Sequence, residues 1–327
     1  MSNSDGLKLL NRLQRKLDDR VEAKSIRTIK LGTRKAGESP TIDFSSNDYL
    51  GIAHSKTVHK RVQDIYAKYT SENPPPYTGS TGSRLLSGNS QLAVELEKFL
   101  ASIHNRPSAL ICNSGYDANL SLLSSIPLTQ DIIILDELCH NSLIMGIKMS
   151  RIPLGQVHYF RHNDAHHLRE ILNKYGSKMS EDQNLIVVVE SVYSMDGDIA
   201  PLQEILDTAK EFDASVIVDE AHGLGIYGKK NSHQLKLIND VSVKETRTDL
   251  NSNKEYGGTG VLAALNLENH PALLAAVFTY GKAAGCHGAV ICGTRTLIDY
   301  LINYSRPFIY STSLPYIHYG RLKYRMM

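Results

Sequence analysis

The sequence has no large charge excess, no membrane-length apolar run and no paired cysteines, and each absence excludes a class of protein. The formal net charge is +2, so no polybasic field predicts binding to nucleic acid or to an anionic membrane. Residues 1–6 are polar and contain no apolar secretory core. No apolar segment reaches the length of a transmembrane helix. We therefore expect a cytoplasmic protein that has neither a nucleic-acid nor a membrane partner.

Cysteine is also scarce, because the chain has four and none belongs to a Cys-x-x-Cys pair. Three of them lie in or beside apolar, strand-like runs, which indicates buried and reduced thiols. The spacings of four residues among His158, His162 and His166, with His167 beside them, raise the alternative of a metal site. No cysteine or acidic ligand completes a recognisable set, so the sequence predicts no metal.

What the chain does have is a regular alternation of apolar runs and helical patterns. Its 327 residues are 42% hydrophobic and 21% charged, which suits one large domain with a real core. The expected strands are 108–112, 131–135, 157–160, 185–189, 215–218, 272–278 and 288–292. Such repeated units predict an α/β fold with a mainly parallel sheet and helices on both of its faces.

The N-terminal third shows three further patterns. Apolar residues recur at helical spacing from Leu10 to Val21, which predicts an amphipathic helix. The segment 41–50 is expected to begin as a short strand and then to turn. The loop 72–89 is rich in small residues, but it lacks the Lys-Ser/Thr ending of a nucleotide P-loop. A nucleotide site is therefore not predicted there.

Unusual residues gather where the expected strands end, which is where ligands bind to sheets of this kind. They are Gly115, His140, Ser194, Asp219, His222 and Lys282. Taken singly, most have an ordinary interpretation as a turn, a cap or a surface charge. Asp219 is harder to dismiss, because a carboxylate at the end of a buried strand needs a cationic partner.

Lysine, aspartate and histidine together are what an enzyme needs to hold pyridoxal phosphate. Lys282 would form the Schiff base, and Asp219 would keep the pyridine nitrogen protonated, so that the ring becomes an electron sink. The residues around these positions extend the match. Eight segments, in this order, resemble the α-oxoamine synthases, fold-type I pyridoxal-phosphate enzymes that condense an amino acid with an acyl thioester. The segments are DFSSNDYLG (43–51), GSTGSRLLSGN (79–89), SGYDAN (114–119), HND (162–164), ESVYSMDGD (190–198), DEAHG (219–223), TYGKAAG (279–285) and YSTSLP (310–315).

The resemblance implies three catalytic residues, Lys282, Asp219 and His140. His222 is implied as a donor to the phenolic oxygen of the cofactor, and His140 as the residue that stacks on its ring. The remaining implied cofactor contacts are Gly115, Tyr116, Ser194, Thr279, Thr312 and Ser313.

Further implications concern substrate and assembly. Arg27, Asn47 and His140 resemble substrate contacts. Thr312 and Ser313 resemble residues that reach the phosphate of a neighbouring subunit, which implies a homodimer.

The resemblance also implies a reaction and a domain plan. The segment SRLLSGN is most similar to the branch that joins L-alanine to a pimeloyl thioester in biotin synthesis; CoA and a carrier protein stay open as the thiol. One alternative is a sister acyltransferase that uses glycine and another acyl-CoA, and a second is a non-catalytic partner subunit. The expected parts are an N-terminal helix and connector (1–45), a large cofactor-binding domain (46–300) and a stub of the C-terminal domain (301–327). Only 12 residues follow Pro315 (327 − 315), so we expect that domain to be truncated.

Overall fold

The computed structural model describes residues 7–29, 43–72, 78–176, 180, 182–229 and 257–325. The chain divides into two compact units, Met1–Phe44 and Ser45–Met327. The first unit contains α1 (Lys8–Glu22), which confirms the predicted N-terminal helix. Arg27 follows this helix in the same unit, and its predicted contact with substrate stays a prediction, as do the predicted domain boundaries.

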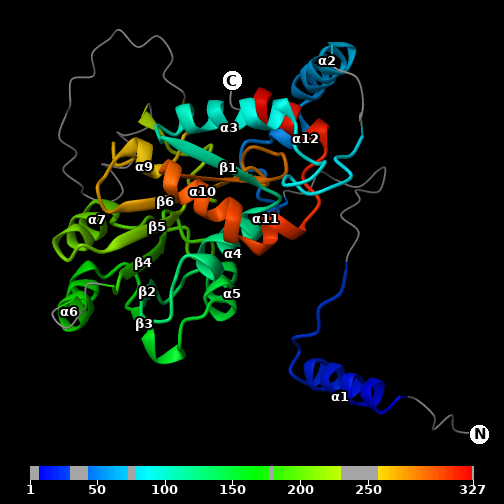
Figure 1. Ribbon diagram of the computed structural model, residues 1–327. Helices are drawn as coiled ribbons and strands as arrows, with labels where there is room; N and C mark the ends of the chain where they lie inside the picture. The colour runs from blue at the N-terminus through cyan, green and yellow to red at the C-terminus, as the bar shows by residue number, and fades with distance from the viewer. Residues whose placement is uncertain are drawn as a thin grey trace, which may run out of the picture. The chain divides into compact units, whose positions relative to one another are not determined.

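The second unit is built on a seven-stranded sheet with the order β1-β7-β6-β5-β4-β2-β3 (Figure 1). From β6 to β3 all neighbours are parallel, whereas β7 is antiparallel to both β1 and β6. All seven predicted strands and the mainly parallel sheet are therefore confirmed. The strands are β1 (Ser108–Cys112), β2 (Ile132–Asp136), β3 (Val157–Phe160), β4 (Leu185–Glu190), β5 (Ser215–Asp219), β6 (Leu273–Thr279) and β7 (Ala289–Gly293).

Helices cover both faces of this sheet, because its buried strands carry apolar side chains on both sides. In β4, Val187 and Val189 belong to one apolar cluster, and Ile186 and Val188 belong to the other. The helices in the first cluster are α3 (Gln91–Ile103), α6 (Ala165–Gly176), α7 (Leu202–Glu211), α9 (Val261–Ala264) and α12 (Tyr316–Arg325). Those in the second are α4 (Gly115–Ser125), α5 (Asn141–Met149) and α10 (Arg295–Tyr304). The short or peripheral helices are η1 (Ile52–His54), α2 (Lys56–Glu72), η2 (Leu154–Gln156) and α11 (Arg306–Tyr310).

One local expectation lies partly outside the described residues. The segment 41–50 turns as expected, and Asp43 and Phe44 form no strand, while 41 and 42 lie outside the described residues. Polar side chains take up backbone N–H groups in this turn. Ser46 Oγ accepts from Asp48 N at 3.1 Å, and the Asp48 carboxylate accepts from Ala53 N at 3.1 Å. Among the described helices, none is both long and apolar enough to span a bilayer.

A buried ion pair fixes the loop before α3. Arg84 and Glu97 form two parallel contacts, and their side chains are only 9% and 14% exposed. Glu97 also accepts from the backbone N of Ile111 in β1 at 2.8 Å. The same loop is tied to the chain's C-terminal part, since Ser313 N donates to Gly82 O at 3.0 Å. One carboxylate therefore links a loop, a helix and an edge of the sheet.

A histidine holds the turn that follows β4. His162 Nδ1 lies 2.8 Å from Asp136 Oδ1, and its Nε2 lies 2.7 Å from Asp198 Oδ2. Asp136 ends β2, whereas Asp198 follows the turn that contains Ser194. Burial lowers the pKa of His162, but the hydrogen bonds and charges of the two aspartates outweigh it and raise the pKa. A protonated His162 thus bridges a strand end and this turn.

We expect Glu97→Gln to destabilise the protein by about 3 kcal/mol, because it leaves the buried Arg84 guanidinium without a counter-charge. Denaturant unfolding followed by circular dichroism measures the change. The matched control is Glu211→Gln, which breaks the exposed pair between Arg169 and Glu211 and should move the midpoint little. Equal small shifts in both variants would contradict the role of the buried pair.

The bridge of His162 should make stability depend on pH. Its folded pKa is raised, so its contribution is fully present below the unfolded histidine pKa of about 6.5 and is lost as pH rises through the folded pKa. The difference in Tm between wild type and His162→Gln should therefore shrink from pH 6 to pH 9. His166→Gln, which removes an exposed partner of Glu170, is the control. A constant difference across this range would refute the bridge.

Candidate active site

Lys282 and His222 meet at the carboxyl end of the sheet. Lys282 follows β6 and His222 follows β5, and Lys282 Nζ lies 2.5 Å from His222 Nε2. Burial lowers the pKa of Lys282, although the charges of Asp219 and Glu190 oppose this. Burial, together with the charge of Lys282 and that of His140, lowers the pKa of His222 to about 4. A neutral imidazole therefore faces the lysine nitrogen near pH 7.

Asp219 is the last residue of β5, and only 4% of it is exposed. Its carboxylate has two fixed donors. Asn119 Nδ2 in α4 donates to Oδ2 at 2.7 Å, and Ala221 N donates to Oδ1 at 2.9 Å. These bonds hold the carboxylate in one orientation at the end of the strand, where it can pair with a cationic ligand.

A second buried carboxyl group lies beside it. Glu190 ends β4 and is the register partner of Asp219 in β5. It is 2% exposed, and Oε1 accepts from His140 N at 2.5 Å. Burial and then the charge of Asp219 raise the pKa of Glu190 to about 8. The protonated form of Glu190 is therefore favoured at pH 7.

His140 is the N-cap residue of α5, and the residue is exposed. Nδ1 accepts from Ser142 N at 3.2 Å and lies 2.8 Å from Ser142 Oγ. Asn119 Nδ2 donates to the same Ser142 Oγ at 2.9 Å. Asn119 is thus shared between Asp219 and the residue that orients His140.

The N-terminus of α4 lies against the end of β6. Ser114 caps this helix by accepting from Asp117 N at 3.0 Å. A Cβ atom on Gly115 would lie 2.1 Å from Thr279 Oγ1, so only glycine allows the helix to approach the end of β6 this closely. Free N–H groups and the helix dipole favour an anion at such a position. The neighbouring Tyr116 is 43% exposed.

These groups fit pyridoxal phosphate by their chemistry. Lys282 offers an amine for the aldehyde, Asp219 a carboxylate for the pyridine nitrogen, and the start of α4 with Thr279 a set of donors for the phosphate. A side chain at position 115 would clash with Thr279, so only backbone atoms can occupy this position. The structure therefore brings together Lys282, His222 and Asp219, and it places Gly115 against Thr279. The contacts of Gly115 and Thr279 with the phosphate stay predictions.

Three other residues were also predicted to contact the cofactor. Ser194 is exposed in the turn after β4, and Thr312 is exposed after α11. Ser313 is buried, and its Oγ donates to Gly88 O at 2.6 Å within the same chain. Their contacts with the cofactor stay predictions.

Three residues of the site were not predicted from the sequence. Asn119 lies in a helix, four residues after Gly115, and this spacing is the one signal for it. Glu190 ends a continuous apolar strand, as Asp219 does, so the same reasoning about a buried carboxylate applied to it. Tyr49, whose hydroxyl lies 2.7 Å from His222 Nδ1, had no signal, because it is 173 residues away in the chain.

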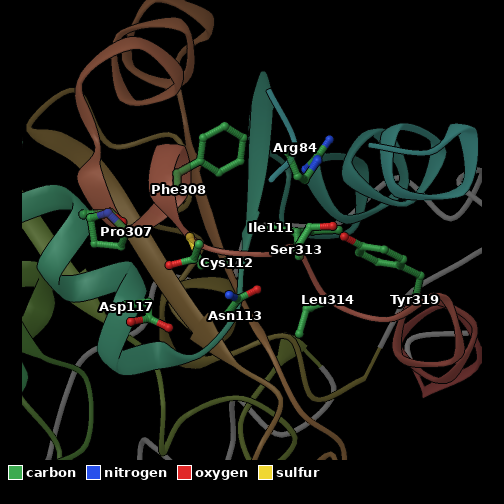
Figure 2. Close-up of a pocket in the computed structure, with 12 residues that line it drawn as sticks. Arg84, Ile111, Cys112, Asn113, Asp117, Pro307, Phe308, Ser313, Leu314 and Tyr319 are labelled. Atoms are coloured by element: carbon green, nitrogen blue, oxygen red, sulfur yellow. The ribbon is translucent and has the colours of Figure 1, made fainter. Parts of the chain in front are cut away.

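A small cavity lies elsewhere, beyond the end of β1. Figure 2 shows Phe308 and Pro307 of α11 on one side of it and Tyr319 of α12 on the other, with Asn113 between them. Neither Lys282 nor Asp219 lines it. The assignment of the active site thus depends on the side chains at the strand ends and not on this hollow.

The chain is similar in sequence to known proteins. The family model for class I and II aminotransferases matches residues 39–322. An 8-amino-7-oxononanoate synthase from Emericella nidulans is 36% identical over 326 residues, which are 95% of this chain and 70% of that protein. A relative from Methanococcus vannielii, also 36% identical, is matched over 62% of its length. The chain thus spans 62–70% of the length of these curated relatives.

Solved structures give the same result. The 8-amino-7-oxononanoate synthase from Francisella tularensis is 25% identical with a TM-score of 0.62, over 87% of this chain and 68% of that one. A structure of serine palmitoyltransferase (SPT) with PLP is 25% identical with a TM-score of 0.74, over 98% and 72%. The predicted resemblance and fold-type I fold are confirmed. The chain therefore belongs to the class I and II aminotransferase family, and its cofactor is pyridoxal phosphate.

Proposed function

We propose that the protein catalyses the condensation of L-alanine with a pimeloyl thioester, giving 8-amino-7-oxononanoate, CO₂ and the free thiol. The observation that carries the proposal is the contact of Lys282 Nζ with a neutral His222, beside the fixed carboxylate of Asp219. The name of the Emericella nidulans relative supports this choice of substrates. In the reaction a carbon–carbon bond forms, and the thioester C–S bond and the bond to the carboxylate carbon break.

Bound pyridoxal phosphate supplies an electron sink for the pair left on the α-carbon of the amino acid. The chain's own residues supply the rest. Lys282, whose pKa is lowered by burial, can act as the base that removes the α-proton and later returns one. Asp219 would hold the pyridine nitrogen of the cofactor in its protonated form, because Asn119 and Ala221 N fix the position of its carboxylate.

His140 and Asn47 would orient the substrate, as the resemblance implies, and Arg27 is proposed as a further contact. Asn47 is exposed, and its Oδ1 accepts from Tyr49 OH at 3.0 Å. We also propose a homodimer in which the exposed Thr312 faces the second copy. The second candidate is a sister reaction that uses another amino acid and another acyl-CoA. Solved serine palmitoyltransferases share the fold, and their name indicates serine and a palmitoyl group as substrates.

Replacing Lys282 with Ala should abolish covalent attachment of the cofactor. Wild-type protein mixed with pyridoxal phosphate should gain visible absorbance, and borohydride should then fix the added mass on the peptide that contains Lys282. The variant should show neither signal. Lys148→Ala, which removes an exposed lysine of α5, should behave as wild type. Attachment at another lysine in the Lys282→Ala protein would refute the assignment.

Release of CoA tests the substrates. Cofactor-loaded protein is assayed with pimeloyl-, acetyl- and palmitoyl-CoA against L-alanine, glycine and L-serine, with Lys282→Ala as the blank. We expect kcat/KM for L-alanine with pimeloyl-CoA to exceed that for glycine by at least about tenfold, which is the discrimination that one methyl group supports. A faster reaction with glycine or L-serine would favour the sister reaction. No release from any pair, despite normal loading, would favour a non-catalytic subunit.

A further inference from the structure

Four polar side chains form a hydrogen-bonded row that leads away from the reactive lysine. Lys282 Nζ lies 2.5 Å from His222 Nε2, and His222 Nδ1 lies 2.7 Å from Tyr49 OH. Tyr49 OH in turn lies 3.0 Å from Asn47 Oδ1. The ring planes of Tyr49 and His222 are tilted by 43°, and the ring centroids are 6.1 Å apart. The contact is therefore made by the Tyr49 hydroxyl and not by stacking of the two rings.

The chemistry of these groups fixes the direction of each bond. A phenol has one hydrogen, and Tyr49 donates it to the carbonyl oxygen Oδ1 of Asn47, which has none to give. The Tyr49 oxygen must then accept from His222 Nδ1–H. Because a neutral imidazole carries a single hydrogen, His222 Nε2 is left with a free lone pair. That lone pair faces the Lys282 nitrogen.

We propose that Tyr49 is a positioning residue that keeps the hydrogen of His222 on Nδ1, so that Nε2 can accept the proton that Lys282 must lose before it acts as a nucleophile. This inference rests on the proposed role of Lys282. In the transfer an N–H bond of the ammonium group breaks and an Nε2–H bond forms. The amine keeps its electron pair, and His222 becomes an imidazolium with a hydrogen on each nitrogen. Tyr49 accepts the one on Nδ1.

The surroundings suit a shared proton. The charged or titratable groups that act on this pair are Asp219, Glu190 and His140. Burial disfavours a charge on either partner, and the charge of Lys282 is one of the causes that lower the pKa of His222. The charge of Lys282 no longer lowers the pKa of His222 once the lysine is neutral. The two groups therefore titrate as a coupled pair. Tyr49 itself is 44% exposed, which places the end of the row at the solvent.

The tautomer of His222 tests the proposal without cofactor or substrate. Cofactor-free protein with ¹⁵N-labelled histidine is studied by NMR at pH 8, where His222 is neutral. Wild type should carry the hydrogen on Nδ1, although a free histidine side chain prefers Nε2. Tyr49→Phe should move it to Nε2, because the acceptor is lost. Asn47→Ala should do the same with the tyrosine intact, because the freed phenol can then donate to Nδ1.

A control variant completes the test. Tyr159→Phe, which alters a tyrosine 50% exposed on the edge strand β3, should leave the tautomer unchanged.

A hydrogen on Nε2 in wild type would overturn the proposal. So would a Tyr49→Phe protein that folds normally and keeps the wild-type tautomer. The tautomer measurement does not involve CoA release. The proposed reaction can therefore be real when this proposal fails, and this proposal can hold when the proposed reaction fails.

Discussion

The site depends on the cost of burying charge at the ends of parallel strands. β4, β5 and β6 lie next to each other and run in the same direction. Their carboxyl ends therefore bring Glu190, Asp219 and Lys282 to the same end of the sheet. Two carboxyl groups and one amine that are largely shielded from water cannot all keep the pKa values of exposed groups. The raised pKa of Glu190 and the lowered pKa of Lys282 are two results of the same constraint. Asp219 keeps its place because two N–H groups fix it.

Much of this architecture could be predicted from the sequence. Apolar runs gave the seven strands to within about a residue, since a strand buried on both faces leaves a continuous pattern. The rule that ligands bind beyond the carboxyl ends of strands then identified Lys282, Asp219 and His222. The strand expected from position 41 lies partly outside the described residues, and Asp43 and Phe44 form none. The turn expected after it is present, and the side chains of Ser46 and Asp48 accept backbone N–H groups there.

The supporting contacts could not be predicted, because they join residues far apart in the chain. Tyr49 reaches His222 across 173 positions, and Asn119 reaches Asp219 across 100. No periodicity connects such residues, and only the folded sheet brings them together. The eight family segments contain Tyr49, Asn119 and Glu190, but a resemblance of segments does not say which atoms meet. Glu190 shows this most clearly, because it shares its strand-end position with Asp219 and yet serves the backbone of His140.

The reversed direction of β7 has a consequence for Lys282. A parallel strand after β6 would have needed a crossover of a dozen residues or more, but an antiparallel one lets the chain return through 280–288 alone. This return is closed by Tyr280 N to Gly288 O at 3.0 Å and by Cys286 N to Tyr280 O at 2.9 Å. The Lys282 amine is thus carried on a short connection between β6 and β7 that these two hydrogen bonds close. Adding residues to this connection would disrupt these hydrogen bonds and move the Lys282 amine relative to the end of β6.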